Sequence, residues 1–94
     1  MLDIKMNTAE ELILIGRFDA SHVDKAYDVF NTIDSTRIIN FSQLEYISSA
    51  GLSVLLKTQK RLSRSGHELI LKKMNRHITE IFKFAGFETL FKIE

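Results

Sequence analysis

The segment that decides the fold runs from Arg37 to Lys73 and reads RIINFSQLEYISSAGLSVLLKTQKRLSRSGHELILKK. It opens with β-branched and aromatic residues typical of a strand. Leucines at helical spacing follow, and Leu69, Ile70 and Leu71 then form a second apolar strand. Gly66 stands where the end of a helix favours a left-handed residue. This order of strand, helix and strand predicts two parallel strands joined by a helical crossover.

Within this segment, the polar pair Ser42-Gln43 predicts a short link after a strand over residues 37–41. Apolar residues then lead to Ser48, which is expected to be the N-cap of the helix, and the helix is expected to end near Ser65.

Two further strands and a helix are predicted before this segment. Residues 2–6 alternate apolar and polar side chains, as in a half-buried strand. Residues 12–15 form a continuous apolar run, typical of a strand covered on both faces. Ser21 and Asp24 have the spacing of a capping box, which predicts the start of a helix. Its apolar stripe consists of Val23, Ala26, Tyr27, Phe30 and Ile33.

A third helix is predicted near the end of the chain, with Asn75 as its N-cap and Gly86 as its C-terminal cap. Its expected buried stripe consists of Ile78, Ile81, Phe82 and Ala85. Phe91 and Ile93 suggest a last short strand. Residues 1–94 are therefore predicted to form one α/β domain, with a mixed, mostly parallel β-sheet of about five strands and three main helices.

Composition excludes several kinds of function. With 13 lysines and arginines against 12 aspartates and glutamates, the net charge is +1, so we expect no direct nucleic-acid partner. The local cluster Lys57, Lys60, Arg61 and Arg64 is interpreted as a solvated helix face. Without cysteine there is no disulfide or zinc-thiolate site. No apolar run approaches the roughly 20 residues that span a bilayer, so we expect a cytoplasmic protein with no membrane insertion.

Residues that would support catalysis are few. The three histidines, His22, His67 and His77, fall at the ends of different predicted elements and lack metal-binding spacing. The four glycines stand apart, so they form no phosphate-binding loop, and no serine lies in a G-x-S-x-G pattern. We therefore expect no catalytic residues, no metal and no cofactor.

Two adjacent hydroxyl residues, Ser48 and Ser49, lie where a predicted strand meets a predicted helix. Capping accounts for Ser48. Ser49 would then lie in the first turn, at the positive end of the helix dipole, where free N–H groups stabilise a phosphate. The domain could therefore carry a phosphate on Ser49 without unfolding.

Three stretches carry a resemblance to the anti-sigma factor antagonist family, the bacterial members of the STAS domain superfamily. Residues 16–19, Gly-Arg-Phe-Asp, match the family's Gly-x-Leu/Phe-Asp. Residues 41–52, with Tyr-Ile-Ser-Ser-Ala-Gly-Leu at 46–52, match its central Asp-Ser-Ser/Thr-Gly-Leu, which an aromatic-aliphatic pair precedes. Residues 81–87, Ile-Phe-Lys-Phe-Ala-Gly-Phe, match its Leu-Phe-x-x-x-Gly-Leu. The resemblance covers essentially the whole chain.

This resemblance implies a switch between partners. An unphosphorylated antagonist binds an anti-sigma factor that is also a serine kinase, and this binding frees a sigma factor for transcription. The kinase phosphorylates one serine of the antagonist and binding is lost; a serine phosphatase is the expected further partner. Ser49 matches the phosphorylated serine, with Ser48 as the second choice. The partner-binding residues implied are Asp19, Ser21, Ser48, Ser49, Ala50, Gly51 and Leu52.

The sequence departs from the family motif at two positions. Ser48 stands where the family usually has aspartate, and Ala50 replaces the usual second hydroxyl residue. One alternative is a STAS docking subunit of a membrane transport complex, such as a lipid-exporting ABC system, or a domain of a larger signalling assembly. Another alternative, a small enzyme or nucleotide-binding protein, is disfavoured by the missing catalytic residues. The sequence leaves the oligomeric state open.

Overall fold

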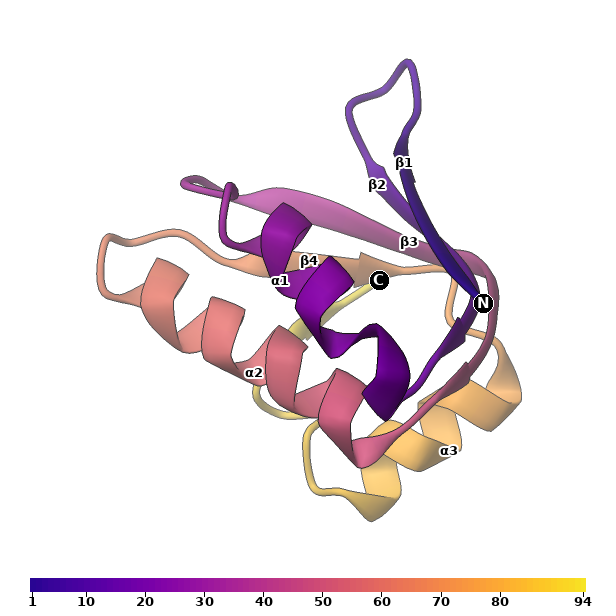
Figure 1. Cartoon of the computed structure of the whole chain (residues 1–94). Helices are drawn as coiled ribbons and strands as arrows, with labels where there is room; N and C mark the ends of the chain where they lie inside the picture. The colour runs from indigo at the N-terminus through magenta and orange to yellow at the C-terminus, as the bar shows by residue number, and fades with distance from the viewer.

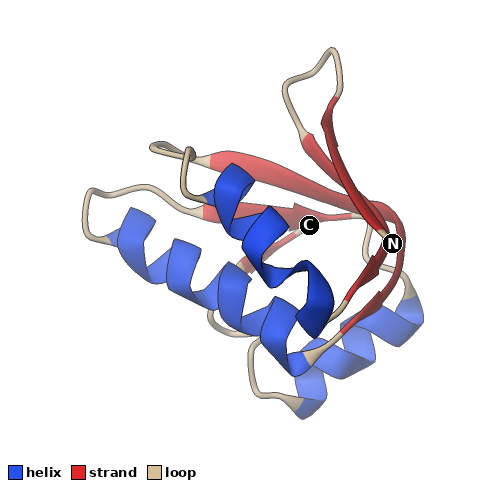
Figure 2. Ribbon diagram, viewed as in Figure 1, coloured by secondary structure: helices blue, strands red, loops and turns tan.

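The computed structural model describes residues 1–94. Five strands form one sheet in the order β1-β2-β3-β4-β5: Leu2–Met6, Leu12–Phe18, Arg37–Ile47, Leu69–Lys72 and Lys92–Ile93. The helices are α1 (Val23–Phe30), α2 (Ser49–Ser63) and α3 (Arg76–Phe84), and a short 3-10 turn, η1, spans Ala20–His22. β1 pairs antiparallel with β2, and the other three pairs are parallel. The predicted fold class is confirmed (Figures 1 and 2).

The helices cover one face of the sheet, and the other face is more open. Along β2, Leu12 and Leu14 are buried, whereas Ile13 and Ile15 are only half-buried. The expectation that residues 12–15 are covered on both faces is therefore wrong. The continuous apolar run reflects the position of β2 between β1 and β3. Side chains of these neighbouring strands partly cover Ile13 and Ile15 on the open face.

Strand β3 continues through the predicted link at Ser42-Gln43, so the prediction of a break there is wrong. Ile13 pairs with Asn40 and Ile15 with Gln43, so one intervening residue of β2 lies opposite two of β3. Such a β-bulge inserts one residue without ending the strand. The Asn40 side chain accepts a hydrogen bond of 2.8 Å from the amide of Ser42, which satisfies the displaced backbone.

A second irregularity in β3 lies opposite Gly16 and Arg17, which pair with Leu44 and Tyr46. Each irregularity shifts by one residue the alternation of side chains between the two faces of the sheet. The buried apolar side chains of β3 after Ile39 are therefore spaced by two, three and three residues: Phe41, Leu44 and Ile47.

Aromatic side chains join the helices to the sheet. Phe30 of α1 stacks on Phe18 of β2, with ring centres 6.5 Å apart. Phe82 of α3 meets Phe41 and Phe91 edge-on, at 6.0 and 5.8 Å. Ile78 and Phe82 are buried as predicted, but Ile81, Val23 and Tyr27 are only partly buried. Ala85 is exposed, because α3 ends at Phe84 and the chain turns away at Gly86.

The predicted caps are confirmed except at α1. Ser48 and Asn75 accept hydrogen bonds from Gly51 and Ile78, and Gly66 and Gly86 have positive φ. The capping box of Ser21 and Asp24 is wrong: Asp19 instead accepts from the amide of Ser21 and begins η1, from which α1 continues.

Candidate partner-binding site at the start of helix α2

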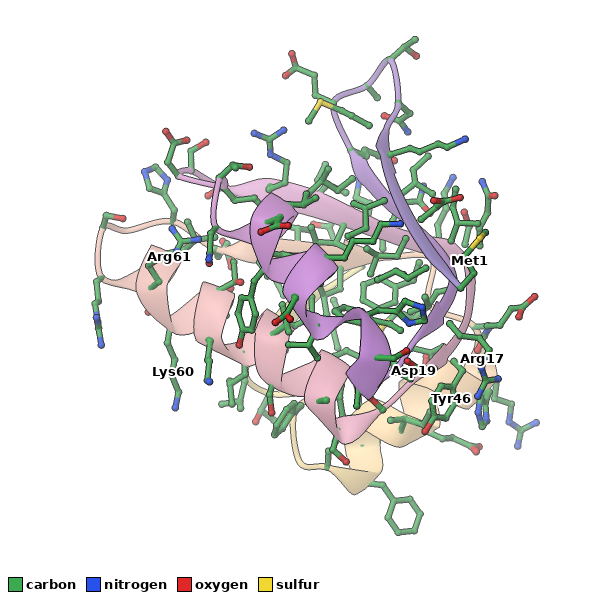
Figure 3. All side chains as sticks on the ribbon, in the orientation of Figure 1. Met1, Arg17, Asp19, Tyr46, Lys60 and Arg61 are labelled. Carbon is green, nitrogen blue, oxygen red and sulfur yellow. The ribbon has the colours of Figure 1, made fainter.

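The parallel strands β2 and β3 bring two predicted site segments together. At their carboxyl ends, the amide of Ser48 donates a 2.9 Å hydrogen bond to the carbonyl of Phe18. Asp19 follows Phe18 directly, and η1 packs against α2. Asp19 and the start of α2 therefore lie at the same edge of the sheet, although they are distant in the sequence (Figure 3).

The two serines have different environments. Ser48 is the N-cap of α2: its backbone is extended, and its hydroxyl accepts a 3.3 Å hydrogen bond from the amide of Gly51. Ser49 is the first residue of the helix and is exposed. Its hydroxyl makes no hydrogen bond, and the amides of Ser49 and Ala50 have no acceptor. Ser49 therefore presents a free hydroxyl beside two free N–H groups at the positive end of α2.

Gly51 and Leu52 belong mainly to the core. A Cβ atom on Gly51 would lie 2.9 Å from both the side chain of Ile47 and the carbonyl of Phe18, which is closer than such atoms approach one another. Leu52 is 5% exposed and shows only its edge to solvent. Gly51 and Leu52 therefore support the start of α2 from within the core. The solvent-facing surface there is formed by Ser48, Ser49 and Ala50.

Asp19 is the centre of a small polar cluster. It accepts hydrogen bonds from the amide and the hydroxyl of Ser21, at 3.0 and 2.6 Å, and lies 2.9 Å from Nδ1 of His22. The pKa of Asp19 lies below its ordinary value of 3.8, mainly because the Ser21 hydroxyl donates a hydrogen bond to the carboxylate. The Ser21 amide and the nearby His22 lower the pKa by smaller amounts. The cluster holds Asp19 as a carboxylate at the end of β2.

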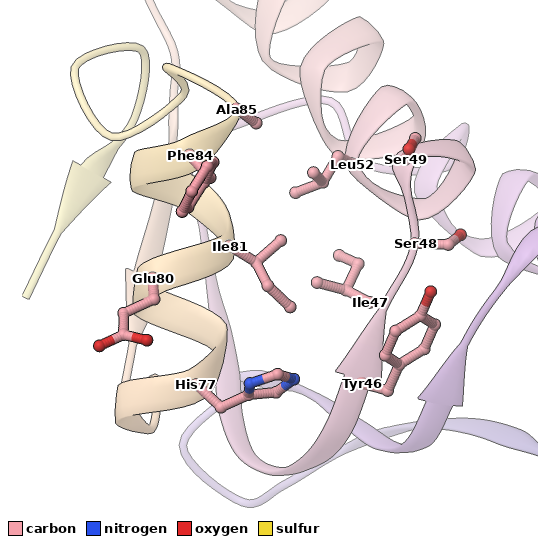
Figure 4. A pocket seen from close by; sticks show the side chains of 10 residues that line it. All are labelled: Tyr46, Ile47, Ser48, Ser49, Leu52, His77, Glu80, Ile81, Phe84 and Ala85. Atoms are coloured by element: carbon pink, nitrogen blue, oxygen red, sulfur yellow. The ribbon is translucent and has the colours of Figure 1, made fainter.

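An open groove of about 560 Å³ separates the start of α2 from α3. Figure 4 shows Ile81 of α3 facing Ile47 and Leu52 across it, with Ser49 and Phe84 at opposite rims. Phe84 is 97% exposed, which is unusual for a large apolar side chain. The residues that line the groove are Tyr46, Ile47, Ser48, Ser49, Leu52, His77, Glu80, Ile81, Phe84 and Ala85.

Sequence reasoning did not identify the α3 side of this groove. The helical spacing predicts Ile81 and Ala85 as core residues, and it predicts no contact for Phe84. One signal was present in the sequence: Phe84 lies outside the apolar stripe of its own helix, where a large aromatic residue has no core to fill.

A cation–aromatic pair also lies at this edge. The Arg17 guanidinium stacks over the Tyr46 ring, 4.4 Å from its centre, on neighbouring strands of the open sheet face. Figure 3 shows this pair near Asp19. Because Tyr46 also lines the groove, the Arg17 guanidinium places a positive charge beside this part of the groove wall.

The histidines do not converge. His22 contacts Asp19, His77 lines the groove, and His67 precedes β4. No group of three or more histidine, aspartate or glutamate side chains is arranged to hold a metal ion. None of the helices has both the length and the apolar character needed to cross a bilayer.

Comparison with known proteins places this architecture in a family. The sequence model of the STAS domain matches residues 15–94, so the chain belongs to the STAS domain family. A protein of Bordetella bronchiseptica, named "Putative anti-sigma factor antagonist BtrV", is 38% identical over 56 residues. That match covers 60% of this chain and 48% of BtrV, so the chain spans about half the length of this curated relative.

Two solved structures share the fold. The anti-sigma factor antagonist SpoIIAA in its unphosphorylated form has a TM-score of 0.71 and 20% identity, over 100% of this chain and 87% of that one. The phosphorylated form of SpoIIAA, a Bacillus cell fate determinant, has a TM-score of 0.70 and 21% identity, over 100% and 91%. At these identities the likeness establishes the fold.

Proposed function

We propose that this STAS domain is an anti-sigma factor antagonist that is switched by phosphate on Ser49. Its unphosphorylated form binds an anti-sigma factor that is also a serine kinase, and so controls transcription from a sigma factor in the cytoplasm. The observation that carries the proposal is the free, exposed hydroxyl of Ser49 at the rim of an apolar groove. The name of BtrV and the likeness to the SpoIIAA fold also support a role as an anti-sigma factor antagonist.

The proposed contact surface combines an apolar centre with polar edges, as protein interfaces commonly do. Ile81 supplies the α3 side of the apolar centre, and Phe84 extends the apolar surface at its rim. Asp19 and Ser21 supply a carboxylate and a hydroxyl on the other side of Ser49. A kinase that docks on this surface would have the Ser49 hydroxyl within the buried area, which suits both binding and phosphate transfer.

Phosphate on Ser49 would add roughly −1.5 to −2 charge at neutral pH. The two free amides at the start of α2 would stabilise that charge within the domain. Against a docked partner the same charge must be desolvated, which costs several kcal/mol. A loss of about 4 kcal/mol weakens binding roughly a thousandfold. Phosphorylation would therefore release the partner without unfolding the domain.

Ser48 takes the position of the family's usual aspartate. The geometry of the N-cap shows how a serine can replace that aspartate. The hydroxyl accepts the Gly51 amide as a carboxylate would, but without a charge. A neutral cap leaves the start of α2 more positive, which favours the phosphate on Ser49. A serine phosphatase would reverse the modification.

The test is to incubate the protein with ATP and the anti-sigma-type serine kinase encoded nearest to its gene, and to map the phosphate by mass spectrometry. The Kd for the kinase is then measured by calorimetry with both forms of the protein. We expect phosphate on Ser49, and a Kd for the phosphorylated form that is weaker by a factor of about 1,000, which corresponds to 4 kcal/mol.

Two variants control this experiment. Ser49→Ala should bind the kinase constitutively and accept no phosphate, whereas Ser48→Ala should still be phosphorylated. Phosphate on Ser48 alone, or no phosphate on either serine with an active kinase, contradicts the proposed switch. The second result favours a docking role in a transport or signalling assembly.

A further inference from the structure

Helix α2 and its C-cap carry four cations on one face, which we call the basic stripe: Lys57, Lys60, Arg61 and Arg64. With 3.6 residues per turn, the four positions fall within an arc of about 100°. From Tyr46 to His67 the chain has no carboxylate side chain. None of the four cations forms an ion pair. The basic stripe is therefore a concentrated positive surface on a chain of net charge +1.

A groove of about 480 Å³ runs beside the basic stripe, between α1 and α2. The residues that line it are Tyr27, Asn31, Lys57, Thr58 and Arg61. Most of these side chains are polar, and the Lys57 ammonium lies 5.9 Å from the centre of the Tyr27 ring. The groove thus offers hydrogen-bonding groups, two cations and one aromatic wall.

Arg61 is fixed in place at one end of this groove. Its guanidinium donates hydrogen bonds to the carbonyls of Phe30 and Ile33, at 2.9 and 2.7 Å, where α1 ends. Lys60 instead makes no hydrogen bond with its side chain and extends from α2 into solvent (Figure 3). One cation is therefore pre-positioned, and others are free to adjust to a ligand.

We infer that the basic stripe and its groove bind an extended acidic segment of a protein partner. Cations four residues apart on α2 are separated by about 6 Å along the helix axis. Alternate side chains on one side of an extended segment repeat every 6.6 Å or so. Carboxylates at every second position of such a segment therefore match the pairs Lys57–Arg61 and Lys60–Arg64.

The flank of the groove favours this occupant over nucleic acid. Asp24 and Asp28 are exposed on the neighbouring helix α1, and neither pairs with the basic stripe. A broad phosphate backbone would meet these carboxylates, whereas a narrow peptide can lie in the groove along its α2 wall, which Lys57, Thr58 and Arg61 form. The stripe begins eight residues beyond Ser49, about 12 Å along the helix, so this surface is separate from the proposed switch.

The test is an NMR titration of the ¹⁵N-labelled full chain with a peptide of alternating glutamate and serine. We expect amide shifts confined to residues of the α1–α2 groove, and binding that weakens as salt rises from about 50 to 300 mM, because exposed charges are screened. The double variant Lys57→Glu/Lys60→Glu should lose at least tenfold in affinity. Arg61 is left unchanged because it holds the end of α1.

A matched control is Lys5→Glu/Lys92→Glu, which changes the net charge equally at exposed strand positions. This variant should bind the peptide like the parent protein. Equal weakening in both variants, shifts centred on Ser49, or no binding at low salt would overturn the inference. Tighter binding of a DNA duplex or of phosphatidylglycerol vesicles at the same residues would overturn the assignment of a peptide as the occupant.

Discussion

The carbonyl of Phe18 accepts a hydrogen bond of 2.9 Å from the amide of Ser48, and this bond joins the end of β2 to the start of α2. The same carbonyl lies under Gly51, where a Cβ atom would approach it to 2.9 Å. The glycine of the central motif is therefore required by the close approach of helix and strand. The surface around Ser49 depends on that approach.

Gly51→Ala is expected to destabilise the domain by about 1–3 kcal/mol, because the added methyl group must displace Ile47 or the Phe18 carbonyl. Urea unfolding followed by circular dichroism measures this loss. Ser53→Ala, at an exposed position of the same helix, is the control and should stay within about 0.5 kcal/mol of the parent. An unchanged stability for Gly51→Ala would mean that α2 is not packed so closely on β2.

Substitution of Ser48 and of Ser49 should have different effects on the free energy of unfolding. Ser48→Ala removes the hydroxyl that caps α2 and should cost about 1 kcal/mol, whereas Ser49→Ala removes a hydroxyl without a partner and should cost almost nothing. The same urea experiment distinguishes them. Equal losses for both variants would contradict the capping geometry.

Two phenylalanines of α3 offer a second contrast. Phe82 is buried against Phe41 and Phe91, so Phe82→Ala should cost about 3–5 kcal/mol of stability through lost burial and a residual cavity. Phe84 is almost fully exposed, so Phe84→Ala should change stability by less than about 0.5 kcal/mol.

If the groove is the docking surface, Phe84→Ala should weaken binding of the kinase by more than tenfold, or about 1.4 kcal/mol. Calorimetry with the Phe84→Ala protein measures this loss independently of folding. Binding at the parent affinity would place the contact surface elsewhere.

Local patterns in the sequence predicted the three helices and the N-caps of α2 and α3, because periodicity and capping depend on near neighbours. Asn75 and Ser48 cap the helices as expected, and Phe82 lies in the core. The β-bulge at Ser42 could not be predicted in this way. It depends on the register between β2 and β3, which a single strand does not encode.

The site was predictable in part for the same reason. Ser48 and Ser49 stand out because a strand meets a helix there. The α3 side of the groove, including Phe84, depends on how two helices that are distant in the sequence pack on one sheet. The family motif predicts that Asp19 binds a partner. Its role as the cap of η1 depends on a turn that the spacing of Ser21 and Asp24 did not reveal.

The last prediction concerns Asp19. Its pKa in the folded protein lies below the ordinary value of 3.8, mainly because the Ser21 hydroxyl donates a hydrogen bond to the carboxylate. Ser21→Ala should therefore raise the pKa of Asp19 toward 3.8. A ¹³C NMR titration of the side-chain carboxyl groups measures this change. Glu11, whose pKa is lowered mainly by hydrogen bonds from Asn40 and Asn7, is the internal control and should keep its value.

The same hydrogen bond has a consequence for stability. Because the folded-state pKa of Asp19 is lowered, the unfolded chain binds more protons between that pKa and 3.8, and stability rises with pH across this interval. The contribution is fully present above 3.8 and is lost as the pH falls through the lowered value. Ser21→Ala should make the stability curve shallower there, as measured by urea unfolding at a series of pH values. An unchanged pKa for Asp19 in the variant would show that the Ser21 hydroxyl does not hold the carboxylate.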